Sequence, residues 1–166
     1  MTAANPSATD IVPVVVTDAA PLAALPAACF DEHWSAASVA GLLSGFGTFG
    51  FWALIHGVQG RLPVGYVLVR AVGDEAEILS IAVLLERRGH GIAAGLLARA
   101  LDAAAQRGAR KVFLEVAAGN APAIGLYARA GFAKAGVRRA YYSAPGGARD
   151  ALVFARTLAK PASIEL

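Results

Sequence analysis

Residues 75–94 read EAEILSIAVLLERRGHGIAA. Glu75 to Leu85 is an apolar run that predicts a strand, and Ile92 to Arg107 carries apolar residues at helical spacing. Gly89 and Gly91 lie between these two segments and indicate a turn. The sequence therefore predicts a strand that passes through a glycine turn into a helix.

The chain after this helix predicts a second strand and a second helix. Gly108 ends the first helix, and Lys111 to Ala117 predicts a short buried strand. Ala121 to Ala130 predicts a helix with Asn120 as its N-cap. The segment from Glu75 to Ala117 is thus predicted to be a β-α-β crossover, whose two strands should lie parallel.

Antiparallel strands are expected before and after this crossover. Gly47 to His56 and Pro63 to Ala71 are strand-like and flank a turn-prone segment, so they predict a hairpin. Ala133 to Tyr142 and Arg149 to Leu158 predict two strands near the C-terminus. The expected fold class is therefore α/β, with a mixed, mostly antiparallel sheet and one parallel crossover.

The N-terminal part of the chain predicts one more strand and two short helices. Ile11 to Thr17 is rich in β-branched residues and predicts the strand. Ala19 to Phe30 and Ser35 to Ser44 predict the helices, and Pro26 should interrupt or end the first of them.

The composition indicates a folded domain. The 166 residues are 57% apolar and 16% charged, which is enough to bury a core. We expect one domain over residues 11–160, between a flexible N-terminus (1–10) and a C-terminal tail (161–166). No apolar stretch reaches about 18 residues and the start does not resemble a secretory leader, so the sequence predicts a cytoplasmic protein without a membrane partner.

Metal and nucleic-acid sites are not expected. Cys29 is the only cysteine, and His33, His56 and His90 lack the four-residue spacing of a helical metal pair. A net charge of +3 is too small an excess for a typical nucleic-acid surface, so no direct nucleic-acid partner is expected. Such a charge suits a small anionic ligand.

Two glycine patterns in the chain are candidates for phosphate binding. Gly45, Gly47 and Gly50 spell GxGxxG, but they follow a predicted helix and precede a predicted strand. A dinucleotide site needs the opposite order, because the phosphate must meet the N-terminus of the helix. We therefore interpret this copy as a flexible loop.

The second pattern, residues 88–93, lies between a strand and a helix as phosphate binding requires. The first amides of the helix lack intrahelical partners there, and the positive end of the helix dipole lies behind them. Small residues at 89, 91 and 93 would let phosphate oxygens reach the backbone, and Arg88 would add charge at the rim. An ordinary tight turn before a core helix is the alternative interpretation.

A dinucleotide-binding module remains a further alternative. Gly89, Gly91 and Ala94 satisfy GxGxxA, and Glu115 lies downstream as a candidate ribose ligand. Against this interpretation, Glu115 falls inside a predicted strand rather than at its end, and the chain predicts antiparallel strands where a doubly wound sheet needs more crossovers.

The residues around the second pattern resemble a known family. Arg88-Gly89-His90-Gly91-Ile92-Ala93 is similar to the acetyl-coenzyme A signature of the GNAT superfamily of N-acetyltransferases, [Q/R]-x-x-G-x-[G/A]. The resemblance to the RimI branch of that superfamily extends to Ile81-Ala82-Val83, Leu114-Glu115-Val116, Asn120 to Tyr127, Gly131-Phe132, Arg138 to Tyr142 and Asp150-Ala151. His33 and Leu84-Leu85 depart from the family pattern.

The resemblance implies a GNAT fold with helices on both faces of the sheet and acetyl-coenzyme A as co-substrate, with no metal. RimI enzymes acetylate the N-terminal alanine of the eighteenth small-subunit ribosomal protein. The implied partner is therefore the N-terminal peptide of a protein, and in the RimI branch that protein is ribosomal. A GNAT enzyme that acts on a small-molecule amine and a non-catalytic acyl-coenzyme A-binding protein are the alternatives.

The resemblance also implies roles for individual residues. In the strand Ile81-Ala82-Val83, the backbone amide of Val83 would donate to the thioester oxygen. The amides of residues 89 to 93, which are Gly89, His90, Gly91, Ile92 and Ala93, would hold the pyrophosphate beside Arg88. Glu115 matches the general base, Tyr127 matches the general acid and a cofactor contact, and Asn120 matches a coenzyme A contact.

Overall fold

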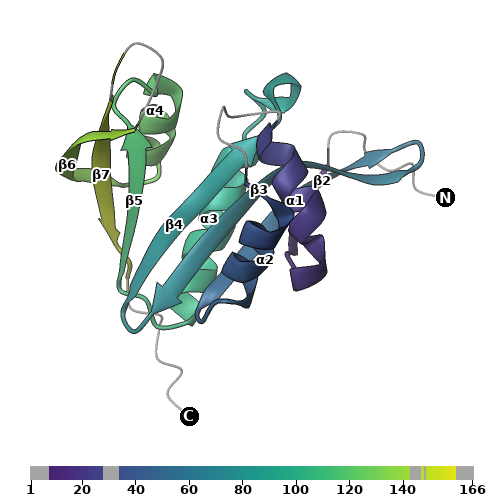
Figure 1. Cartoon of the computed structure of the whole chain (residues 1–166), viewed down its shortest axis with the longest axis horizontal. Coiled ribbons are helices and arrows are strands. Elements are labelled where there is room, and N and C mark those ends of the chain that lie inside the picture. Colours follow the sequence, from purple (N-terminus) through teal and green to yellow (C-terminus); the bar gives the residue numbers. More distant parts are fainter. Residues whose placement is uncertain (1–7, 28–33, 143–146, 148, 160–166) are drawn as a thin grey trace. The chain divides into compact units, whose positions relative to one another are not determined.

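The computed structural model describes residues 8–27, 34–142, 147 and 149–159 (Figure 1). The strands are β1 (Thr9–Pro13), β2 (Thr48–Gly57), β3 (Gly60–Val72), β4 (Glu75–Val83), β5 (Lys111–Ala117), β6 (Ala133–Tyr142) and β7 (Arg149–Thr157). The helices are α1 (Ala19–Ala27), α2 (Ala36–Ser44), α3 (Ile92–Gln106) and α4 (Ala121–Arg129), with short 3-10 turns η1 (Val16–Asp18) and η2 (Leu85–Arg87).

The strands form one 7-stranded sheet in the order β1-β2-β3-β4-β5-β7-β6. β4 and β5 pair in parallel, from Glu75 with Lys111 to Ile78 with Leu114. The pairs β1–β2, β2–β3, β5–β7 and β6–β7 are antiparallel. The predicted β-α-β crossover, the hairpin before it and the mixed sheet are therefore confirmed. A doubly wound parallel sheet is ruled out by the same pairing.

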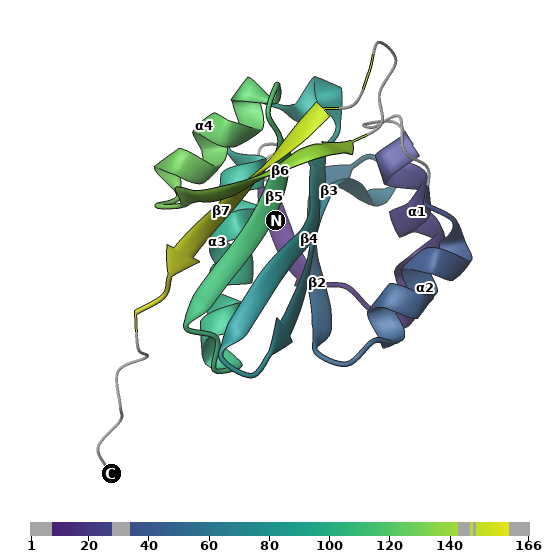
Figure 2. The same cartoon turned by 60° about the vertical axis from the view of Figure 1, so that its left-hand side comes forward.

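The chain forms two compact units. The first unit comprises residues 1–70 and 79–100. In it, α1 and α2 lie on one face of β2 and β3, and the first part of α3 lies on the other face (Figures 1 and 2). Successive residues of β3 face opposite sides of the sheet. Tyr66 packs in the cluster under α1 and α2. Its neighbour Gly65 faces α3, since a Cβ at Gly65 would lie 3.3 Å from Leu96 Cδ1.

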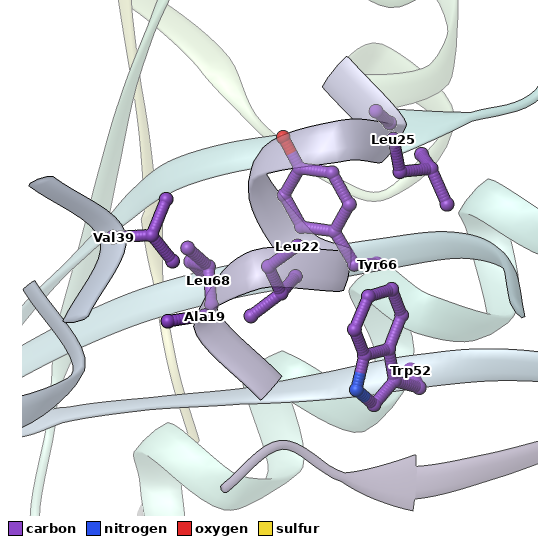
Figure 3. Close-up of a cluster of buried hydrophobic side chains, with 8 residues drawn as sticks. Ala19, Leu22, Leu25, Val39, Trp52, Tyr66 and Leu68 are labelled. Atoms are coloured by element: carbon purple, nitrogen blue, oxygen red, sulfur yellow. The ribbon is translucent and has the colours of Figure 1, made fainter. Parts of the chain in front are cut away.

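The core under α1 and α2 is drawn in Figure 3. It is built from Leu22 and Leu25 of α1, Val39 of α2, Trp52 of β2, Tyr66 and Leu68 of β3, with Ala19 and Ala82. The polar tips of its aromatic residues are satisfied, because Trp52 Nε1 donates to Asp18 Oδ2 at 3.0 Å and the Tyr66 hydroxyl bonds Ser80 Oγ at 2.7 Å. This core fixes α1 and α2 on the sheet.

The second unit comprises residues 71–78 and 101–166. Burial alternates along β5, where Val112, Leu114 and Val116 are buried and the residues between them are more exposed. The helix α4 begins at Asn120, whose Oδ1 accepts from the Ala123 amide at 3.3 Å, as predicted. Its C-terminal end is held by Arg156 of β7, which donates to the Ala130 carbonyl at 2.6 Å.

The N-terminal elements differ in their bounds from the sequence prediction. The strand expected over residues 11–17 ends at Pro13, and η1 follows it. Asp18 explains the early end, because its Oδ2 accepts from the Val15 amide at 2.9 Å and so favours a turn. The helix α1 runs through Pro26 to Ala27, so Pro26 does not interrupt it; its predicted end at Phe30 lies outside the described residues.

Leu84 and Leu85 were predicted to extend β4, but the strand ends at Val83 and η2 follows. The described helices are all too short or too polar to cross a lipid bilayer.

Candidate functional site

The second glycine pattern forms an open turn between β4 and α3. Gly89 and Gly91 have φ angles of 79° and 76°, which L side chains rarely adopt. A Cβ at either glycine would meet nothing within 4 Å. The glycines are therefore required by the backbone path, and the space beside them is free for a ligand.

The N-terminus of α3 follows this turn directly. The carbonyl of Gly91 accepts from the Gly95 amide at 3.0 Å, which makes Gly91 the first residue to receive an intrahelical hydrogen bond. The amides of Ile92, Ala93 and Ala94 belong to the first helical turn, where no intrahelical carbonyl is available to them. Together with the helix dipole they form a site suited to an anion.

Two side chains of the turn stabilise it by hydrogen bonds to nearby backbone carbonyls. Arg88 Nε donates to the Val83 carbonyl at 3.1 Å, and His90 Nδ1 lies 2.9 Å from the Arg88 carbonyl and 3.3 Å from that of Arg87. The sequence predicted a charge at the rim for Arg88 but not this contact. Only the spacing of five residues between Arg88 and the strand end hints at it.

The side chains of the last two residues of β4 are buried on opposite faces of the sheet. Ala82 is buried in the core under α1 and α2, and the Val83 side chain is buried on the opposite face, where it would lie 3.1 Å from a Cβ at Gly65. Ile81 is half-buried. Any contact of Ala82 or Val83 with a cofactor must therefore use main-chain atoms.

Glu115 lies on β5 directly after Leu114, the last residue of the β4–β5 register, and opposite Val153 of β7. Its side chain is 18% exposed, and its Oε1 lies 2.9 Å from Nε of Arg138, which is 58% exposed. The guanidinium of Arg138 in turn lies over the Tyr141 ring, 5.4 Å from its centroid. The candidate base is thus accessible and ion-paired, a partnership that sequence reasoning missed.

Tyr127 and Asn120 both lie in α4 or at its start. Tyr127 is 6% exposed, and its ring packs edge-on against Phe132 with centroids 6.0 Å apart. Asn120 is exposed and caps the helix. Tyr127 therefore has an ordinary packing role, and Asn120 has an ordinary helix-capping role.

The predicted site residues fall into two groups along the chain. Residues 81–93 belong to the first unit, and Glu115, Asn120 and Tyr127 belong to the second. Within the described ranges, no cluster of His, Cys, Asp and Glu is suited to hold a metal ion. Cys29 and His33 lie outside those ranges.

The first glycine pattern is structural, and its interpretation as a loop is wrong for its last residue. Gly45 is the C-cap of α2 and Gly47 turns the chain at a φ of 76°. Gly50 is buried within β2, where a Cβ would lie 2.5 Å from the Val67 carbonyl oxygen. It allows two strands to approach closely.

Comparison with known proteins places these features in a family. The family model of the acetyltransferase (GNAT) family matches residues 20–132, which include the glycine turn, Glu115 and Tyr127. The chain is 38% identical over 97 residues to [ribosomal protein bS18]-alanine N-acetyltransferase of Escherichia coli (strain K12), which covers 58% of this chain and 66% of that relative, just under two thirds of its length. It is 40% identical over 84 residues to mycothiol acetyltransferase of Clavibacter michiganensis subsp. michiganensis, over 51% of this chain and 27% of that protein.

Solved structures share the fold. The ribosomal-protein-S18-alanine N-acetyltransferase from Escherichia coli superposes with a TM-score of 0.84 at 27% identity, covering 96% of this chain and 99% of that one. Arabidopsis thaliana NAA60 in complex with acetyl-CoA has the same fold, with a TM-score of 0.81 at 20% identity over 91% and 99% of the two chains. The predicted GNAT fold is confirmed, and the chain belongs to the acetyltransferase (GNAT) family.

Proposed function

We propose that this chain is an N-acetyltransferase that moves the acetyl group of acetyl-coenzyme A to the α-amine of a protein N-terminus. The proposed acceptor is the N-terminal alanine of ribosomal protein bS18, the substrate named for the Escherichia coli relative. The observation that carries the proposal is the open glycine turn at the start of α3, with Gly89 and Gly91 at positive φ and free space beside both.

The glycine turn fits the pyrophosphate of coenzyme A. The amides of residues 89–93 would bind its oxygens, since the first turn of α3 has donors without intrahelical acceptors. Arg88 would add positive charge, and its contact with the Val83 carbonyl keeps the turn close to the end of β4. The backbone of Ile81 to Val83 would run beside the pantetheine arm, with the Val83 amide directed to the thioester oxygen.

The transfer itself needs a base, an acid and a neutral nucleophile. Glu115 would take a proton from the acceptor amine, directly or through water, as the amine nitrogen forms a bond to the thioester carbon. Tyr127 would give a proton to sulfur as the carbon–sulfur bond breaks, so that free coenzyme A leaves as a thiol. Asn120 would contact coenzyme A while it caps α4.

An α-amine suits this machinery better than a lysine side chain. Free α-amino groups have a pKa of about 7.7 to 8.0, whereas lysine has a pKa of about 10.4. At neutral pH a substantial fraction of N-termini is already neutral. For an N-terminal acceptor, a single carboxylate such as Glu115 therefore needs only to take the proton that the nitrogen releases as it bonds to carbon.

A small-molecule amine is the second candidate acceptor. It is favoured by the identity of 40% over 84 residues to mycothiol acetyltransferase, a stretch that covers only 27% of that protein. The bS18 assignment rests on a longer match, of 97 residues.

Turnover with defined acceptors tests the proposal. The full chain is incubated with acetyl-coenzyme A and a peptide that copies the bS18 N-terminus, and thiol release is followed together with the peptide mass. We expect thiol release and a mass gain of one acetyl group, with none on the same peptide after N-terminal blocking. Turnover on polyamines or amino sugars alone would move the acceptor to small molecules. Coenzyme A binding without turnover on any amine would contradict the enzyme assignment.

A further inference from the structure

The ion pair of Glu115 and Arg138 joins two strands that are not neighbours. β7 lies between β5 and β6, and Val153 of β7 pairs with Glu115 on one side and with Gly136 on the other. Arg138 lies two residues beyond Gly136 and therefore on the same face of the sheet as Glu115. Its long side chain reaches back over β7 to place Nε 2.9 Å from the carboxylate.

A bulge in β6 begins directly after Arg138. Arg138 pairs with Ala151 and Tyr142 pairs with Arg149, so residues 139–141 stand opposite Asp150 alone. Ala140 has a φ of 52°, and its amide donates to Asp150 Oδ1 at 2.8 Å. This conformation is unfavourable for a residue other than glycine, so the surrounding structure must stabilise it.

The bulge explains the contact between Arg138 and Tyr141. In a regular strand, residues three positions apart point to opposite faces. Here the two extra residues of β6 turn the chain, and the Tyr141 ring comes to lie 5.4 Å from the Arg138 guanidinium. Glu115 and Tyr141 thus form two sides of a site suited to a cation, and the Arg138 guanidinium occupies that site.

We propose that Arg138 is a specificity-determining residue that neutralises Glu115 and so restricts the acceptor to amines that arrive uncharged. This inference rests on the proposed function, in which Glu115 receives the acceptor. A bare carboxylate beside an aromatic ring would attract ammonium ions, and so would bring charged amines, lysine side chains among them, to the group that removes the proton. With Arg138 in place the pair has no net charge, and a second cation is repelled.

The size of the effect follows from elementary electrostatics. A like charge at about 4 Å costs about 1 kcal/mol even in bulk water, or about fivefold in binding, and more where the dielectric is lower. At pH 7.5 about a third of α-amines but only about one lysine in a thousand is neutral. Excluding the charged forms therefore favours N-termini strongly over lysine side chains and polyamines.

The first test uses a permanent cation that cannot be acetylated. The affinity of butyltrimethylammonium is measured by calorimetry for the wild-type chain and for Arg138→Gln. We expect binding at least about fivefold tighter in Arg138→Gln, since Glu115 and Tyr141 then face the probe. Arg138→Lys should remain within about twofold of wild type, and the double variant Glu115→Gln with Arg138→Gln should lose the gain.

Arg139→Gln is the matched control, because it removes the same charge from the adjacent exposed position. If it gained as much affinity as Arg138→Gln, the effect would belong to general surface charge and the proposal would be wrong. Equal affinity of wild type and Arg138→Gln would also overturn it. This test needs no turnover, so it decides the role of Arg138 even if the proposed activity fails.

The second test measures acceptor choice. One peptide carries a free N-terminus and no lysine, and the other has a blocked N-terminus and a single lysine. For Arg138→Gln, we expect the ratio of kcat/KM for the lysine peptide to that for the α-amine peptide to rise at least about fivefold, mainly through a lower KM for lysine. An equal loss for both peptides would show a merely structural role. Absence of turnover by the wild-type chain on both would contradict the proposed function instead.

Discussion

Arg88 and Val83 are joined by a hydrogen bond of 3.1 Å, from the side-chain Nε of Arg88 to the backbone carbonyl of Val83. The two residues lie at either end of the segment that connects β4 to the glycine turn. The contact therefore fixes the turn relative to the strand end, and under the proposed function it fixes the pyrophosphate site relative to the thioester site. It gives Arg88 a positional role in addition to its charge.

Replacing Arg88 should weaken cofactor binding. We expect Arg88→Ala to raise the Kd for acetyl-coenzyme A about tenfold, or about 1.4 kcal/mol, because both the brace and a positive charge are lost. Arg87→Ala is the control, since Arg87 is an exposed neighbour with the same charge. Calorimetric titration of both variants checks the prediction, and equal losses would reduce Arg88 to a general electrostatic role.

A side chain at position 91 should abolish most of the cofactor affinity. Gly91→Glu places negative charge where the pyrophosphate is proposed to bind, and we expect the affinity for acetyl-coenzyme A to fall about a hundredfold or more, about 2.8 kcal/mol. Gly73→Glu is the matched control, because Gly73 also has a positive φ of 63° and open space at its Cβ. Both variants should lose similar stability. An affinity unchanged within about twofold in Gly91→Glu would move the site elsewhere.

The first glycine pattern should affect folding rather than binding. In Gly50→Ala the new Cβ would lie 2.5 Å from the Val67 carbonyl oxygen and 2.6 Å from Leu68 Cδ2. We expect a loss of about 1–3 kcal/mol or more in the free energy of unfolding, as for other overpacked cores. Gly41→Ala, in α2 with nothing within 4 Å of its Cβ, should instead gain up to about 1 kcal/mol. Urea denaturation measures both. A weakened coenzyme A affinity in the folded fraction of Gly50→Ala would restore this pattern as a ligand site.

Local signals made much of the fold predictable. The strand Lys111–Ala117 was predicted with its observed bounds, and Asn120 caps α4 as expected, because burial pattern and capping depend on near neighbours in sequence. The turn at Gly89 and Gly91 was predicted for the same reason, since only glycine commonly adopts its backbone angles.

Long-range geometry could not be predicted in this way. The pair of Glu115 and Arg138 depends on β7 lying between their strands, and the contact of Arg138 with Tyr141 depends on the bulge at Ala140; neither leaves a local signal. The tight fit of Gly50 depends on the register of β2 with β3. The shortened β1 shows a conflict between levels, because β-branched residues favour a strand while the Asp18 carboxylate favours a turn.

The last prediction is that Glu115 and Tyr127 divide the proton transfers. Glu115→Gln keeps the shape of the side chain but cannot accept a proton, so we expect kcat/KM to fall about a hundredfold or more while acetyl-coenzyme A affinity persists. The loss should be similar across the neutral pH range, because in both proteins the acceptor arrives uncharged and Glu115 takes its proton only as the nitrogen bonds to carbon. Glu77→Gln is the control, a half-buried glutamate on the neighbouring strand β4. A loss shared by Glu77→Gln, or one accompanied by weaker acetyl-coenzyme A binding, would return Glu115 to a structural role.

Tyr127→Phe should instead lower kcat, because the departing coenzyme A thiolate loses its proton donor. The ring would keep its edge-on packing against Phe132, so we expect a stability loss of no more than about 1–2 kcal/mol. Tyr66→Phe is the matched control: it removes a buried hydroxyl that bonds Ser80 at 2.7 Å, and it should cost similar stability without lowering kcat. Steady-state kinetics and thermal unfolding of both variants separate the two effects. If Tyr127→Phe kept full kcat at neutral pH, the proton would have to reach sulfur by another route, and Tyr127 would be a core residue of α4.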